Sequence, residues 1–137
     1  MPRVVLDTNV LIAAARAPRS ASRKIVAACL DGRVEAVVSE GSRKEYDLII
    51  DQALSGVAYV EQIRKFIDAC LPVEPLSVPR VVQEDPEDDK LVALAIAAHA
   101  DVLVTSDDHL ASLGEVDGSS PILSPSKTLA RFPEISS

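Results

Sequence analysis

Two short aliphatic runs in this chain end at a polar segment that contains an aspartate. Residues 4–6 (Val-Val-Leu) are followed by Asp7, and residues 102–104 (Val-Leu-Val) are followed by Thr-Ser and then Asp107. Runs of this length, rich in β-branched residues, are typical of buried strands. In an open parallel sheet, ligands bind at the edge where the strands' carboxyl ends lie. We therefore expect both aspartates at that edge.

Strand-like and helix-like segments alternate along the rest of the chain, without repeats or low-complexity tracts. The expected strands are residues 3–6, 34–39 and 101–105, with at most one short strand around Val73 and a last edge strand at residues 122–123. The expected helices are residues 10–15, 20–30, 42–54, 57–69 and 86–99, a short one around Leu110, and 127–132. This alternation predicts a single domain over residues 1–137, folded as a three-layer α/β/α sandwich with a mostly parallel central sheet.

Composition narrows the class of protein. The chain is 47% hydrophobic but only 3% aromatic, so its core must be aliphatic. No apolar run reaches the length of a membrane span, and Asp7 and Asn9 interrupt the amino-terminal stretch, so we expect a soluble, cytoplasmic protein without membrane contact. Cys29 and Cys70 have no CxxC spacing and are expected to be unpaired core thiols. A net charge of −7 argues against a nonspecific coat on duplex DNA, but not against a nuclease whose acids bind metal ions.

A third acidic motif, Asp-Pro-Glu-Asp-Asp, occupies residues 85–89. Asp85 and Glu87 are explained well by a helix start, with an N-cap aspartate, proline at the first helical position and acids in the first turn. Two further acids exceed what a cap requires. Asp88 falls on the helix face of the apolar stripe, whereas Asp89 lies about 100° further around and is expected to be solvated.

Each remaining acid has an ordinary structural explanation. Asp7 could cap the helix expected from Val10, Asp107 could cap the helix through Leu110, and Glu45 could simply be solvated on its helix. The argument for function rests on the combination. Carboxylates gathered at one sheet edge repel one another unless a cation lies between them, so a divalent metal site is the leading hypothesis.

Four motifs in order give a family resemblance. They are Asp-Thr-Asn-Val-Leu at residues 7–11, a Ser-led helix carrying Glu45 and Tyr46, Asp-Pro-Glu-Asp-Asp-Lys-Leu at 85–91, and Ala-Asp-Val-Leu-Val-Thr-Ser-Asp-Asp-His-Leu at 100–110. Together they resemble the PIN-domain ribonucleases over nearly the whole chain. The chain looks closest to small prokaryotic PIN proteins of the VapC-like toxin type.

The resemblance implies a set of site residues. The catalytic, metal-binding acids would be Asp7, Glu45, Asp88 and Asp107, with Asp89 as the alternative to Asp88 and with Thr8, Asn9, Thr105 and Ser106 as supporting groups. One or two Mg²⁺ or Mn²⁺ ions would be bound. Residues 41–44 (Gly-Ser-Arg-Lys) depart from the family's usual apolar residues, which makes Glu45 the weakest member of the set.

The same resemblance implies an activity and partners. The protein would be a metal-dependent endoribonuclease acting on single-stranded RNA, the toxin of a toxin-antitoxin pair with an antitoxin partner, and a homodimer. RNA phosphates could contact a basic cluster that could equally be a solvated charged face: Arg16, Arg19, Arg23 and Lys24.

Two other functions stay open. The chain could be a PIN module that binds RNA or protein without cutting. It could also be an aspartate-dependent phosphotransfer domain, although Asn9 stands where that chemistry wants a second aspartate, and no lysine follows the late strand before Lys127. His99 and His109 show no zinc-ligand pattern.

Overall fold

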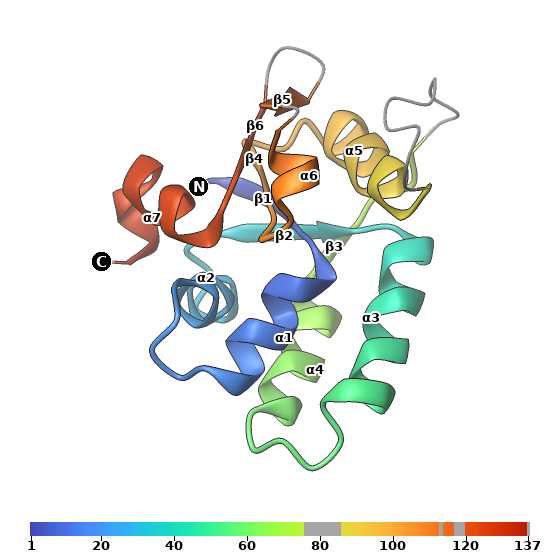
Figure 1. Cartoon of the computed structure of the whole chain (residues 1–137), viewed down its shortest axis with the longest axis vertical. Coiled ribbons are helices and arrows are strands. Elements are labelled where there is room, and N and C mark those ends of the chain that lie inside the picture. Colours follow the sequence, from blue (N-terminus) through green and yellow to red (C-terminus); the bar gives the residue numbers. More distant parts are fainter. Residues whose placement is uncertain (76–85, 113, 117–119, 137) are drawn as a thin grey trace.

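The structure, a computed structural model of the whole chain, describes residues 1–75, 86–112, 114–116 and 120–136. Its six-stranded sheet has the order β3-β2-β1-β4-β6-β5 (Figure 1). In chain order the strands are β1 (Arg3–Leu6), β2 (Glu35–Val38), β3 (Leu71–Pro72), β4 (Val102–Val104), β5 (Glu115–Val116) and β6 (Ser120–Leu123). Adjacent strands from β3 to β6 pair in parallel, and β5 pairs antiparallel with β6. Leu6 is opposite Val104, so β1 and β4 end level with each other at the same edge.

Helices connect the strands. They are α1 (Thr8–Arg16), α2 (Ala21–Leu30), α3 (Glu40–Ala53), α4 (Val60–Ala69), α5 (Pro86–Ala98), α6 (Asp108–Ala111), α7 (Pro125–Arg131) and the 3₁₀ turn η1 (Pro133–Ile135). Serine caps fix three of the starts, because the side chains of Ser20, Ser39 and Ser124 each accept a hydrogen bond from an amide of the first turn of α2, α3 and α7.

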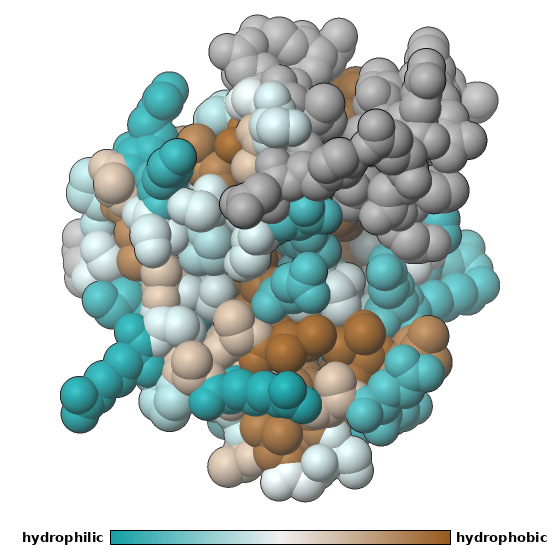
Figure 2. Space-filling view, in the orientation of Figure 1, coloured by the Kyte–Doolittle hydropathy of each residue, from teal (hydrophilic) through white to brown (hydrophobic). Residues whose placement is uncertain are grey.

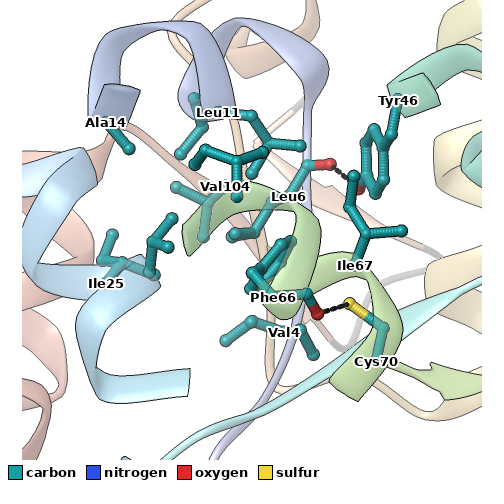
Figure 3. Packing of buried hydrophobic residues seen from close by; sticks show 14 of the residues in the cluster. Val4, Leu6, Leu11, Ala14, Ile25, Tyr46, Phe66, Ile67, Cys70 and Val104 are labelled. Carbon is teal, nitrogen blue, oxygen red and sulfur yellow. Dashed lines mark hydrogen bonds between the residues drawn. The ribbon is translucent and has the colours of Figure 1, made fainter. Parts of the chain in front are cut away.

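The sheet is covered on both faces. Along β1, Val4 and Leu6 belong to the core formed with α1, α2, α3 and α4, part of which is drawn in Figure 3. Val5 points to the opposite face and packs in a second cluster with α5 and α6. This alternation follows from the two-residue period of a strand. The predicted three-layer α/β/α sandwich with a mostly parallel sheet is therefore confirmed.

Some predicted boundaries shift. α1 begins at Thr8, directly after Asp7, rather than at residue 10, and α3 begins at Glu40 because Ser39 and Ser42 form a capping box. α4 begins at Val60 rather than at residue 57. The stretch before it contains turns at residues 55–56 and 58–59, and Gly56 has a φ of +79°. Val57, between these turns, packs on the core.

The last strand predicted at residues 122–123 is present as part of β6 and pairs with β4, but β6 is not the edge strand of the sheet. The two-residue β5, which was not foreseen, pairs with Ser120 and Pro121 on the outer side of β6. A strand of two residues is too short to show a hydrophobic period. At the other edge, the strand expected around Val73 is β3 (Leu71–Pro72), and the Val73 amide still donates to the Val38 carbonyl at 2.8 Å.

Two further observations concern the described residues. No helix among them is long and apolar enough to cross a membrane. Cys29 and Cys70 are both free thiols, as predicted, and Cys70 is buried.

Candidate active site

Polar residues follow four parallel strands at the carboxyl edge of the sheet. Ser39 follows β2, Asp7 follows β1, Thr105 follows β4 and Ser124 follows β6. The strand ladder continues one residue into this edge, because the Asp7 amide donates to the Val104 carbonyl at 2.9 Å and the Thr105 amide donates to the Leu123 carbonyl at 3.0 Å. The backbone of both site residues is thereby fixed by the sheet.

Thr105 links the two aspartate segments. Its hydroxyl donates a hydrogen bond to Oδ2 of Asp7 at 2.7 Å, and the Thr105 Oγ1 atom in turn accepts a hydrogen bond from the backbone amide of Asp107 at 3.0 Å. Thr105 is 1% exposed and Asp7 is 9% exposed, so this bridge lies inside the protein. The structure thus brings together Asp7 and Asp107, which the two strand-ending motifs suggested.

The environment of Asp7 opposes its negative charge. Burial raises the pKa of the Asp7 carboxyl above its ordinary value, and the charge of Asp107 raises this pKa further. The hydrogen bond from Thr105 and the backbone amides of Thr8 and Asn9 act in the opposite direction without cancelling the effect of burial. A buried carboxylate with a second acid beside it is an environment that a bound cation would relieve.

Capping explains part of the environment of Asp7. Asp7 has the extended backbone of an N-cap residue before α1, and the amides of Thr8 and Asn9 lie close enough to its carboxylate to lower its pKa, although no capping hydrogen bond of regular geometry forms. Asp107 also precedes a helix, α6, and its carbonyl accepts the Ala111 amide at 2.9 Å. The capping alternative therefore keeps support at both residues, from the backbone of Asp107 and from the α1 amides near Asp7, while the Asp7 carboxylate also accepts the Thr105 hydroxyl.

Tyr46 is a site-supporting residue that the motifs did not identify as such. It is 1% exposed on α3, and its hydroxyl donates to the carbonyl of Leu6, the residue directly before Asp7 (Figure 3). Burial raises the pKa of Tyr46, with further contributions from Cys70, Asp7 and Glu45. The sequence signal for this role was the place of Tyr46 beside Glu45 in a helix that begins at the carboxyl edge of the sheet.

Glu45 is half-buried on α3, which packs against both α1 and α5. The helix bearing this acid therefore lies beside the helix that begins after Asp7. Of the supporting residues, Thr8 and Thr105 are buried, whereas Asn9 and Ser106 are exposed.

The middle motif is only partly visible. α5 begins at Pro86 as predicted and places Asp88 and Asp89 in its first turn, and it packs on β1, β4 and α3. Position 88 precedes the buried Val92 by one turn, on the face that covers the sheet. Asp85 and the side chains of residues 86–89 lie outside the described part of the structure.

Within the part of the chain that the structure describes, which leaves out those side chains, no three acids, histidines or cysteines are grouped closely enough to form a metal site. His99, which follows α5, is exposed and has φ of 51°.

The basic cluster lies away from the acids. Asp7 stands at the amino-terminal end of α1 and Arg16 at the opposite end, about 13 Å along the axis at 1.5 Å per residue. Arg19, Arg23 and Lys24 follow in the connection to α2 and in its first turns. The cluster therefore does not belong to the immediate surroundings of Asp7.

Comparison with known proteins decides the family. The family model of the PIN domain matches residues 3–109, which include Asp7, Glu45, Asp88 and Asp107. The chain belongs to the PIN-domain family. This PIN domain also resembles a solved structure, that of PAE2754 from Pyrobaculum aerophilum, with a TM-score of 0.56 and 14% identity over 97% of this chain and 90% of that one. At this identity the likeness establishes the fold alone. No curated protein sequence matches the chain.

Proposed function

We propose that this PIN domain is a metal-dependent endoribonuclease that hydrolyses single-stranded RNA. The family indicates nuclease-type chemistry. The observation that carries the proposal is the buried Asp7 carboxylate, oriented by Thr105 and placed beside Asp107 at the carboxyl edge of the sheet. Ligands of open α/β sheets bind at this edge.

The residues present fit a hard divalent cation. Mg²⁺ and Mn²⁺ favour carboxylate and other oxygen ligands, and the site offers Asp7 and Asp107 with burial that disfavours an uncompensated charge on Asp7. Glu45 from α3, and Asp88 or alternatively Asp89 from α5, would complete the set. An ion held there would activate water and neutralise charge that develops on the phosphate.

The chain's own groups supply positioning. Thr105 fixes one oxygen of the Asp7 carboxylate, and the sheet fixes the backbone on both sides of that bond. Tyr46 holds the Leu6 carbonyl and so ties α3 to the end of β1. Because misplacing reacting groups by about 1 Å costs rate steeply, these buried bonds would matter for catalysis as well as for folding.

The physiological part of the proposal is a toxin of a toxin-antitoxin pair, acting as a homodimer with an antitoxin partner in the cytoplasm. Its support is the resemblance to VapC-like proteins. One feature of the surface agrees with an association: Leu48 on α3 is 53% exposed, and Figure 2 shows apolar surface on the side where α1, α3 and α4 lie.

The deciding experiment is cleavage of a single-stranded RNA by the purified protein with Mn²⁺ and with EDTA. We expect cleavage that needs the metal and that leaves a 5′-phosphate and a 3′-hydroxyl. Asp7→Asn should abolish this cleavage. The matched control is Asp31→Asn, which changes an exposed aspartate directly after α2. Cleavage surviving Asp7→Asn, with an unchanged circular dichroism spectrum, would show that the site is wrongly assigned.

A further inference from the structure

Basic residues are concentrated in one acid-free stretch. Residues 8–30, which contain α1 and α2, hold four of the chain's 14 lysines and arginines and none of its 21 acids, although the net charge of the chain is −7. The four basic residues of the stretch lie between positions 16 and 24, at and beyond the end of α1 that is remote from Asp7. An RNA strand bound at Asp7 and running along α1 would reach this positive charge.

A cavity of about 490 Å³ opens at the carboxyl-terminal end of α1. It is lined by Arg16 and Arg23, by Tyr59 at the start of α4, and by small apolar groups that include Pro18 and Val57. The Arg23 guanidinium lies over the Tyr59 ring, 3.4 Å from the ring centroid. We call this the Arg23–Tyr59 cavity.

Backbone contacts hold both arginines in place. Nε and Nη2 of Arg23 donate to the carbonyls of Ala14 and Ala15 at 2.5 and 3.2 Å, and Nη2 of Arg16 donates to the carbonyl of Ala53 at 2.6 Å. These bonds satisfy carbonyls near helix ends, which is a structural role. A guanidinium has five N–H donors, however, so each arginine keeps donors beyond those engaged with the described residues.

The combination in this cavity matches the chemistry of a nucleotide. A base can stack on a planar aromatic-guanidinium pair between apolar walls, and the remaining guanidinium N–H groups can donate hydrogen bonds to a phosphate. Helix capping accounts for the carbonyl bonds of both arginines. It does not account for the tyrosine ring that Arg23 covers at the same cavity, or for the absence of acids from residues 8–30.

We propose that the Arg23–Tyr59 cavity is a second RNA subsite, which holds a nucleotide of the single-stranded substrate a few nucleotides away from the bond that is cut. The inference rests on the proposed ribonuclease function for the identity of the ligand. The length of α1 separates this subsite from Asp7 by about 13 Å, so only RNA longer than the cleaved step reaches both.

The first test compares RNA of two lengths. Binding of a 4-nucleotide and a 12-nucleotide single-stranded RNA is measured by fluorescence anisotropy in the full chain carrying Asp7→Asn, which prevents cleavage. Arg23→Met and Tyr59→Leu are compared with Arg64→Met, an exposed arginine of α4. We expect the first two to lower the ratio of 12-mer to 4-mer affinity about tenfold, as expected for loss of one stacked base. An unchanged ratio overturns the subsite.

A second measurement uses the unmodified cavity, in case either substitution disturbs folding. A 12-nucleotide RNA carrying 4-thiouridine at successive positions is irradiated with the protein, and crosslinked peptides are identified by mass spectrometry. Crosslinks to the segment containing Tyr59 support the subsite, and their absence at every position contradicts it. Failure of the ribonuclease proposal is a separate outcome, because it would appear as no Mn²⁺-dependent cleavage of either RNA by the parent protein.

Discussion

The hydroxyl of Thr105 donates a hydrogen bond to Oδ2 of Asp7 across 98 residues of sequence. The bond exists because β1 and β4 are parallel neighbours that end level with each other. It fixes the orientation of a buried carboxylate at a point where the chain leaves the sheet. The behaviour of Asp7 therefore depends on a residue from the far end of the sequence.

We expect Thr105→Val to weaken metal binding. Valine keeps the shape but removes the donor, so the charged form of Asp7 loses a hydrogen bond and the pKa of Asp7 rises further. The free energy of unfolding of the metal-free protein should fall by about 1–2 kcal/mol, measured with urea. Thr128→Val, at a fully buried threonine of α7, is the matched control. Mn²⁺ should raise the melting temperature less in Thr105→Val than in Thr128→Val. An equal reduction of this rise in both variants would argue against a specific role of Thr105 in metal binding.

We expect Asp7→Asn to stabilise the metal-free protein at neutral pH. An unfolded aspartate ionises near pH 3.8, and the folded state raises this pKa, so the native protein is favoured below pH 3.8 and loses that stability as the pH rises through the raised value. Asparagine has no such penalty. The difference in unfolding free energy between the variant and the parent, followed from pH 7 to pH 3.5, should shrink towards zero.

At neutral pH, saturating Mn²⁺ should make the parent more stable than Asp7→Asn. The ion stabilises the native state of the parent, whereas the variant lacks one of the ion's ligands. Thermal melting in Mn²⁺ and in EDTA measures this. A variant that is less stable than the parent in EDTA at pH 7 would contradict the electrostatic account.

We expect Tyr46→Phe to affect both stability and the site. The substitution removes the hydroxyl that donates to the Leu6 carbonyl in the core, and should lower the free energy of unfolding by about 1 kcal/mol. The Mn²⁺ dissociation constant should also rise, because Leu6 precedes Asp7. Tyr59→Phe, at a half-buried tyrosine near the carboxyl-terminal end of α1, should change neither quantity. Isothermal titration of Mn²⁺ separates the two effects.

We expect Asp88 and Asp89 to differ as ligands. Position 88 shares a helix stripe with Val92 and Ala95, which are buried, whereas Ala93, one turn after position 89, is half-buried. Asp88→Asn should weaken Mn²⁺ binding at least about tenfold, and Asp89→Asn should weaken it much less. If calorimetry shows the larger loss of Mn²⁺ affinity in Asp89→Asn, then Asp89 and not Asp88 is the ligand.

We expect both thiols to be inert in the native protein. Burial raises the pKa of Cys70 to about 12, and burial, with a smaller effect of Cys70, raises that of Cys29 far above its ordinary value. At pH 8 the Cys70 thiolate is then about one part in 10⁴. Ellman's reagent should count no thiol in the folded protein and two in guanidinium chloride. Rapid native reaction of Cys70 would show that the end of α4 opens.

Much of the fold could be predicted from local signals in the sequence. Aliphatic runs such as residues 4–6 and 102–104 marked β1 and β4, because a buried parallel strand needs apolar residues on both faces. Ser20 and Pro86 marked helix starts, because capping depends on a few adjacent residues. The same runs indicated that Asp7 and Asp107 follow strands.

The tertiary structure alone decided which distant groups meet. Thr105 reaches Asp7, Tyr46 reaches the Leu6 carbonyl, and Arg23 stacks on Tyr59, none of which a local pattern encodes. The placement of β6 inside the sheet also depended on pairing with the two-residue β5. Hydrophobic period and capping act within a few residues and so are legible in sequence. Contacts between segments depend on strand order and register, which the packing of the whole chain determines.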